Sequence, residues 1–226
     1  MPRTTRAARK PRRPYHHGNL RHGLIDEAVA TIRTEGVEGL TLREIGARLG
    51  VSRTALYRHF ADKRALLAAV ATEGFRTLRQ QLITAREEGD GGRAAFDAMG
   101  VAYVRFAVAN PSHYRVMFGG FVDPAASDPE LAGEAAGAFQ LLVDALAALQ
   151  RDAVIRGDDT VKMANFVWAV LHGVAMLGID GQLHEPGGVE ELIPYALERL
   201  RTGIGLDTRH PPARASGRRR PENARR

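Results

Sequence analysis

The sequence contains no cysteine, so a disulfide framework, a cysteine-ligated zinc or iron–sulfur site and a cysteine nucleophile are all excluded. Its composition is not collagen-like or low in complexity, because 44% of the 226 residues are hydrophobic and 26% are charged, as in soluble globular proteins. No apolar run follows Met1, where arginines and prolines stand instead, so a cleaved secretory signal peptide is not expected. We therefore expect a cytoplasmic protein.

Familiar catalytic signatures are missing as well. The sequence has no Gly-x-Ser-x-Gly elbow, no phosphate- or dinucleotide-binding glycine loop and no His-Glu-x-x-His zinc helix. Asp180 and His184 stand four residues apart, and His16 and His17 are adjacent, but such ordinary pairs are weak indications of a metal site. We predict that the protein is not an enzyme and has no metal or cofactor.

Acidic residues are absent from residues 1–14, which carry a net charge of +6, and scarce in residues 207–226, which carry +5. Residues 15–64 carry +2 and residues 65–206 carry −7, so positive charge is concentrated at the two ends of the chain. Lys and Arg gain affinity for polyanions by releasing condensed counterions, which makes the N-terminal quarter a candidate for nucleic-acid binding. Two solvated, disordered tails would show the same charge pattern.

Apolar residues recur at spacings of three and four through most of the chain, which predicts helices rather than strands. Start and stop signals place these helices at about residues 20–36, 42–49, 53–60, 63–88, 93–109, 112–118, 130–150, 159–179 and 190–206. We therefore predict an all-α protein. Its expected parts are a disordered basic arm (1–14), a head (15–64), a body (65–206) and a disordered basic tail (207–226).

Residues 163–179 contain no Asp, Glu, Lys or Arg. These 17 residues are marginal for a membrane span, which needs about 20, and the polar Asn165 and His172 argue against lipid. A helix that is apolar on nearly all sides is more simply explained as buried on both faces. We expect this helix to pack on its own core and on a second copy of the chain, through a dimer interface at about 159–206, with no membrane contact.

The stretch from Thr41 to Phe60 has the pattern of a helix-turn-helix. Thr41 and Glu44 are spaced as in a capping box that opens the first helix, and Gly50 can adopt the positive φ of a sharp turn. Ser52 is a typical N-cap for the second helix. In a helix-turn-helix that second helix enters the major groove of DNA. The alternative is a pair of short packed helices with an incidental polar surface.

The outward positions of the second helix carry hydrogen-bond donors. We predict that Arg53, Thr54 and Arg58 contact base edges, because Arg can bond guanine bidentately. Phosphate contacts, which fix register without reading sequence, are predicted for Thr41, Tyr57, His59 and Lys63, and Ser52 completes the candidate DNA-binding set.

The segment Leu24–Leu67 resembles the DNA-binding domain of the TetR family of transcriptional regulators. Near its end stands the family's Tyr-x-His-Phe-x-x-Lys pattern, as Tyr57, His59, Phe60 and Lys63. Gly46 departs from the alanine that is usual at its position in the family.

The later chain resembles one TetR subgroup, whose C-terminal domain carries a Trp-x-x-x-His-Gly signature, here Trp168 to Gly173. Residues 110–118 and 17–21 are also similar to segments of that subgroup, so the resemblance covers about residues 15–205. It implies a nucleoid-associated repressor, a homodimer that binds a palindromic operator and is released by a small hydrophobic effector. It also implies that the effector shifts the helix at 62–88 and so changes the spacing of the two recognition helices.

A small-molecule pocket needs a mostly apolar wall and a few polar groups that orient the ligand. The polar candidates are His113, Asn165 and His172, although His172 can equally be a core histidine bonded to a backbone carbonyl. The apolar candidates are aromatic and methionine side chains at helical spacing, a pattern that an ordinary core also shows. They are Phe96, Met99, Tyr103, Phe106, Met117, Phe118, Phe121, Phe139 and Trp168.

Two other functions remain open. One is an architectural DNA-binding protein whose body only dimerises, which a single discrete palindrome in footprinting would exclude. The other is a helical enzyme with a vestigial head, against which tight sequence-specific binding without turnover would count.

Overall fold

The computed structural model describes residues 20–125, 128–184 and 186–205, so the expected basic arm and basic tail lie outside the described residues. Within these ranges the chain is all-α, as predicted, with nine helices, no β-strand and one isolated antiparallel bridge between Ile155 and Gly205. The helices are α1 (Leu20–Gly39), α2 (Leu42–Leu49), α3 (Arg53–His59), α4 (Lys63–Glu88), α5 (Gly92–Ala109), α6 (Pro111–Phe118), α7 (Pro129–Arg151), α8 (Thr160–Ile179) and α9 (Val189–Ile204).

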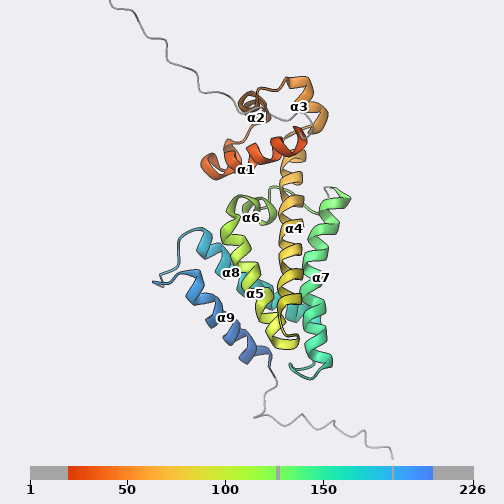
Figure 1. Ribbon diagram of the computed structural model, residues 1–226, viewed down its shortest axis with the longest axis vertical. Coiled ribbons are helices and arrows are strands. Elements are labelled where there is room, and N and C mark those ends of the chain that lie inside the picture. The colour runs from red at the N-terminus through yellow and green to blue at the C-terminus, as the bar shows by residue number, and fades with distance from the viewer. Residues whose placement is uncertain (1–19, 126–127, 185, 206–226) are drawn as a thin grey trace, which may run out of the picture.

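Helices α1, α2 and α3 form the head, at the top of Figure 1. Gly36 interrupts α1 with a φ of 76°, so regular helix ends at the glycine that predicted its end. Gly50 adopts a left-handed φ of 68° and makes the turn from α2 into α3, as predicted. Beneath this turn Ile45 and Leu56 are buried and form a small core under the helix-turn-helix.

The N-caps predicted for α2 and α3 are confirmed, and Asp62 caps α4 in the same way. Thr41 Oγ1, Ser52 Oγ and Asp62 Oδ1 each accept a hydrogen bond from the backbone N–H three residues further on. The capping box at Thr41 is only half formed, because the Thr41 hydroxyl donates to Glu44 Oε2 at 2.9 Å. The Glu44 carboxylate therefore bonds this hydroxyl in place of the backbone N–H that a capping box would use.

Helix α4 joins the head to the body and runs down the centre of Figure 1. It packs against α1 in the head and against α5, α6 and α7 in the body. Its buried side chains continue along its whole length, from Leu66 near the head to Leu82 near the far end. A single helix is thus part of both cores.

Helix α8 is covered by the core of its own chain on one side only. Val167 and Leu171 are buried against the body, whereas Phe166 is 52% exposed and Leu177 is 42% exposed. Tyr195 on the adjacent α9 is 59% exposed. Four of the six large hydrophobic side chains exposed in the described chain lie on these two helices, which gives α8 and α9 an apolar outer face.

By length and composition alone, α7 and α8 are also apolar enough to cross a membrane. Core helices of soluble proteins pass the same test, so this is weak evidence for a span.

Candidate DNA-binding face and ligand cavity

The exposed side of α3 brings together polar side chains that donate hydrogen bonds. Arg53, Thr54 and Arg58 are exposed, and so is 43% of Tyr57, whereas Leu56 on the opposite side is buried in the head. The Arg53 guanidinium lies 5.6 Å from the centre of the Tyr57 ring, a cation–π contact that joins the two side chains in one surface. This helix therefore presents one continuous polar face that nothing else in the described chain covers.

Four of the predicted DNA contacts also have structural roles. Lys63 Nζ donates to the Glu38 carbonyl at 3.2 Å, which ties the end of α1 to the start of α4. The hydroxyls of Thr41 and Ser52 cap their helices, and His59 is half-buried at the end of α3. A lysine ammonium carries three donors, so Lys63 can hold this carbonyl and still bond a phosphate.

The body contains a cavity of about 430 Å³, a volume within the range of small-molecule sites. Its wall comes from α4, α5, α6, α7, α8 and the segment after α6, and none of its described residues is charged. The lining residues are Phe75, Leu78, Leu82, Phe96, Met99, Gly100, Tyr103, Met117, Phe118, Gly120, Val122, Pro124, Ala135, Ala138, Phe139, Leu142, Val167, Trp168 and Leu171.

Seven of the predicted pocket residues line this cavity, namely Phe96, Met99, Tyr103, Met117, Phe118, Phe139 and Trp168. Phe106 does not, because this buried side chain lies beside a separate groove between α4 and α5. Asn165 lies on the outer face of α8, where its side-chain amide donates to the Val161 carbonyl at 2.9 Å. Phe121 and His172 line a separate groove between α1, α6 and α8, and His113 faces α4 and α1.

Sequence reasoning missed the part of the wall that comes from α4. Phe75, Leu78 and Leu82 are visible in the sequence as part of the apolar stripe of a long helix. Nothing in such a stripe separates a cavity wall from solid core, because both need apolar side chains at the same spacing.

Tyr103, Tyr114, Trp168 and His172 form a hydrogen-bonded chain beside the cavity. Trp168 Nε1–H donates to Tyr103 Oη at 2.9 Å, and the two tyrosine hydroxyls lie 2.8 Å apart. Tyr114 Oη lies 2.7 Å from His172 Nδ1. Since an indole can only donate, Tyr103 Oη accepts from Trp168, and Tyr103 Oη also lies 3.3 Å from His172 Nδ1. His172 is therefore bonded to side-chain hydroxyls, and not to a backbone carbonyl.

Burial keeps the members of this chain neutral. It raises the pKa of Tyr103 to about 12 and also raises the pKa of Tyr114, because a phenolate would lose its hydration. For the same reason burial lowers the pKa of His172 below its ordinary value of 6.5. At neutral pH the imidazole is thus uncharged, with one donor and one acceptor nitrogen, and each phenol keeps a proton that it can donate.

The fold and these two features define a class of protein, in which a helix-turn-helix head is mounted on a helical body that contains an apolar cavity. Residues 24–70 match the family described as bacterial regulatory proteins, tetR family. Residues 96–200 match the tetracyclin repressor-like C-terminal domain. The chain belongs to the TetR family of bacterial regulatory proteins, whose members are transcriptional regulators, in agreement with the prediction that it is not an enzyme.

Individual relatives extend this result over most of the chain. The uncharacterized HTH-type transcriptional regulator Rv0681 of Mycobacterium tuberculosis is 26% identical over 216 residues, which cover 92% of this chain and 91% of that protein. The Escherichia coli tetracycline repressor protein class C is 43% identical over 70 residues, but this match covers only 31% of this chain and 32% of the repressor. A solved structure of a protein with unknown function from Rhodococcus sp. RHA1 is 34% identical, with a TM-score of 0.76 over 86% of this chain and 100% of that chain.

Proposed function

We propose that the protein is a ligand-responsive transcriptional repressor, a homodimer that binds a palindromic operator and leaves it when a small apolar effector occupies the body. The course of α4 carries this proposal. Its first residue, Lys63, is bonded to the head, and Phe75, Leu78 and Leu82 line the cavity. A ligand that favours another position of α4 therefore changes how the head is held.

The head, residues 15–64 in this proposal, binds the operator through α3. Arg53, Thr54 and Arg58 have the exposure and the donor groups that base edges require. The phosphate contacts come from Tyr57 and Lys63, with Thr41, Ser52 and His59 at the margins. The protein accordingly works on DNA, in the bacterial cytoplasm.

The body, residues 65–206, dimerises through the apolar outer face of α8 and α9. Phe166, Ala169, Gly173 and Leu177 recur at spacings of three and four along α8, so they form one stripe. A Cβ added at Gly173 would meet no atom within 4 Å, which leaves room for a helix of a second copy to approach closely. Pairing these faces removes the largest group of exposed apolar side chains from water.

The effector in this proposal is neutral and mostly apolar. Among the described residues of the cavity wall, the side-chain polar groups are the Tyr103 hydroxyl and the Trp168 indole N–H, and both are already hydrogen-bonded. A carboxylate or phosphate placed here would have no cation to meet it, and an unpaired buried charge is strongly unfavourable. A hydrocarbon-rich molecule with at most one or two polar atoms suits the cavity best.

The Trp-x-x-x-His-Gly signature contributes directly to this arrangement, which supports the subgroup assignment. Trp168 lines the cavity, and His172, one turn later, ends the hydrogen-bonded chain that starts at the indole. Gly173 lies beside the outer face of α8. The three signature residues thus connect cavity, polar chain and dimer face on a single helix.

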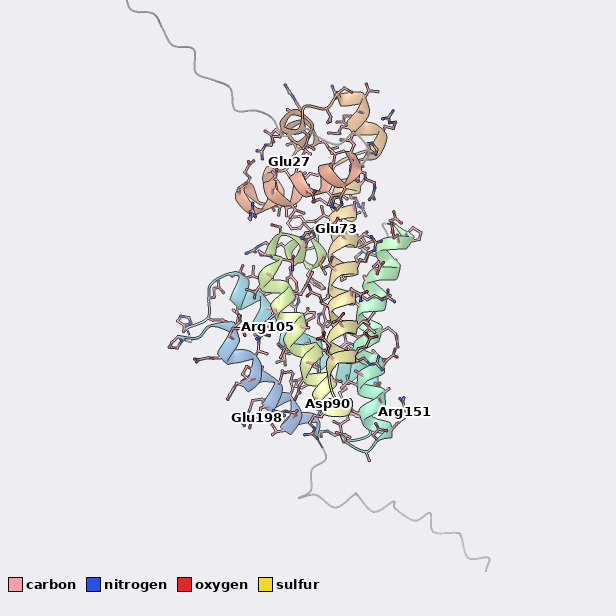
Figure 2. The ribbon with its side chains drawn as sticks, viewed as in Figure 1. Glu27, Glu73, Asp90, Arg105, Arg151 and Glu198 are labelled. Atoms are coloured by element: carbon pink, nitrogen blue, oxygen red, sulfur yellow. The ribbon has the colours of Figure 1, made fainter. Side chains whose placement is uncertain are left out.

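Binding to the DNA upstream of the protein's own gene tests this function. We expect the double variant Arg53→Ala/Tyr57→Phe to raise Kd by at least about tenfold in fluorescence anisotropy at fixed salt, since one good bidentate contact contributes about 1–3 kcal/mol. Arg151→Ala is the matched control, because Figure 2 shows Arg151 at the end of the molecule opposite the head. Wild-type affinity of the double variant would contradict the proposal.

A further inference from the structure

Four potential metal ligands from three helices meet where the head rests on the body. His22 and Asp26 lie one turn apart on α1, and His22 Nε2 is 3.6 Å from Asp26 Oδ1. Glu73 on α4 faces two imidazoles, with Oε2 at 3.8 Å from His22 Nδ1 and Oε1 at 3.9 Å from Nε2 of His113 on α6. Figure 2 shows Glu73 on α4 just beneath the head.

A close approach of two helices brings His113 to this place. A Cβ added at Gly74 would lie 2.5 Å from Met117 Sδ and 3.2 Å from His113 Cβ. Gly74 therefore lets α6 pack closely on α4, and the residue that precedes it on α4 is Glu73. On α1, the spacing of four residues puts His22 and Asp26 on the side of the helix that faces α4.

The charges at this cluster differ from those at the other helix contacts. Within the described residues, no Lys or Arg lies within ion-pair distance of Asp26 or Glu73, which instead face His22 and His113. Other acidic side chains that connect helices are paired with arginine, as in Glu35 with Arg48, Glu134 with Arg76 and Glu190 with Arg105. Two carboxylates facing two imidazoles make a donor set without a cation.

His113 supplies an independent indication. Its side chain is only 16% exposed, and its Nε2 atom is buried with no hydrogen-bond partner. The nearest carboxylate oxygen, Glu73 Oε1 at 3.9 Å, is too far for a hydrogen bond. A buried polar atom without a partner costs about 1–3 kcal/mol, and an ion bound by that atom would remove the cost.

We propose that His22, Asp26, Glu73 and His113 form a binding site for a divalent transition-metal ion of the Zn²⁺ type. Two imidazole nitrogens and two carboxylate oxygens suit Zn²⁺, whereas Mg²⁺ and Ca²⁺ prefer oxygen ligands alone. One donor atom each from His22, Asp26 and Glu73 already lie within 4.8 Å of one another. Tetrahedral Zn²⁺ with bonds of about 2.0–2.1 Å needs ligand atoms roughly 3.3 Å apart, which side-chain rotation at the exposed His22 and Asp26 can supply.

A metal ion at this site would fasten the head to the body. Its ligands come from α1, α4 and α6, so its binding favours conformations in which these three helices stay together. None of the four ligands lines the apolar cavity, so the metal and the apolar ligand occupy separate sites. The protein thus has a second ligand site, which acts where the head contacts the body.

Zn²⁺ titration of the full-length, metal-free protein against a chromogenic chelator tests the site. We expect one Zn²⁺ per chain, and at least about tenfold weaker binding by Asp26→Asn and by Glu73→Gln, since even an outer partner of a metal ligand contributes 10- to 100-fold. Asp26 is 62% exposed, so Asp26→Asn should fold normally, and Zn²⁺ should raise the Tm of the wild type but not of this variant.

Two controls make the result decisive. Glu87→Gln, an exposed site farther along α4, should bind Zn²⁺ as the wild type does. The double variant His16→Ala/His17→Ala should also retain the site, although these adjacent histidines can bind metal themselves. Wild-type Zn²⁺ affinity in both Asp26→Asn and Glu73→Gln, or loss of binding in the His16/His17 variant, would overturn the proposal.

Discussion

The hydrogen-bonded chain of Tyr103, Tyr114, Trp168 and His172 lets four polar side chains lie beside an apolar cavity with their polar groups satisfied. Each buried donor has an acceptor, so none incurs the cost of about 1–3 kcal/mol that an unpaired group would. A ligand that bonds to the Tyr103 hydroxyl or the Trp168 indole must therefore replace an existing bond. Polar ligand atoms gain little here, and apolar surface provides most of the affinity.

The single tryptophan of the chain lines the cavity, which makes its fluorescence a direct report of binding. We expect neutral N-phenylnaphthylamine to quench Trp168, and its sulfonated analogue, anilinonaphthalene sulfonate, to bind at least about tenfold more weakly because its charge meets no cation. Ala138→Phe, which fills the cavity from α7, should weaken both. Equal binding of the two probes, unchanged in Ala138→Phe, would show that the probes bind elsewhere.

The lowered pKa of His172 predicts that the protein loses stability in mild acid. Below about pH 6.5 the unfolded chain takes up a proton at His172 that the folded protein excludes, so acid favours unfolding. Above that pH His172 is neutral in both states and adds no pH dependence. The phenols of Tyr103 and Tyr114, which face this imidazole, stay protonated throughout this range.

Urea unfolding at about pH 5 and about pH 7.5 measures this effect. The difference between the two free energies of unfolding should shrink in His172→Asn, which cannot be protonated. His184→Asn, in the connection between α8 and α9, controls for loss of a histidine as such. An identical pH dependence in wild type and His172→Asn would remove His172 as the cause.

At the level of secondary-structure elements, two glycines of the helix-turn-helix have opposite roles. Gly46 lies inside α2, where a Cβ would approach Leu56 Cδ1 at 2.9 Å, the movable end of that side chain. Gly50 follows α2 with a φ of 68°, which side chains with a Cβ rarely adopt. The first glycine weakens its helix, and the second makes the turn possible.

Alanine substitution separates these two roles. Gly46→Ala should stabilise the protein by up to about 1 kcal/mol, because the helix gains propensity and Leu56 can move slightly. Gly50→Ala should destabilise it by about 1–2 kcal/mol, because the turn requires a left-handed residue. Thermal unfolding followed by circular dichroism compares them, and a lower Tm for Gly46→Ala than for Gly50→Ala would reverse this interpretation.

For the whole molecule, the proposed dimerisation depends on the apolar outer face of α8 and α9. We expect Phe166→Glu to shift the protein from dimer to monomer in sedimentation equilibrium, since the substitution would bury a charge without a partner. The monomer should also lose operator affinity, because two heads are needed for two half-sites. Ala136→Glu adds the same charge at an exposed position of α7 and should leave the dimer intact. A dimeric Phe166→Glu protein would place the interface on another surface.

The all-α fold, the order of the helices and most of their ends could be predicted from the sequence. Helix periodicity and capping are local properties, so Thr41 and Ser52 identified helix starts before any tertiary contact was known. The polar face of α3 could also be predicted from the sequence, because a helix of two turns has only one outward side. The predicted capping box is incomplete at Glu44, because the motif does not determine which donor bonds the carboxylate, and here that donor is the Thr41 hydroxyl.

The sites in the body depended on contacts between distant helices. Phe106 and Asn165 belong to the same helices as true wall residues, and only the rotation of each helix against its neighbours turned them away from the cavity. The proposed metal site could not be predicted from the sequence for the same reason, because Glu73 and His113 lie far from His22 along the chain. Periodicity fixes which residues share a helix face, but packing, which sums many weak contacts over the whole chain, decides what that face meets.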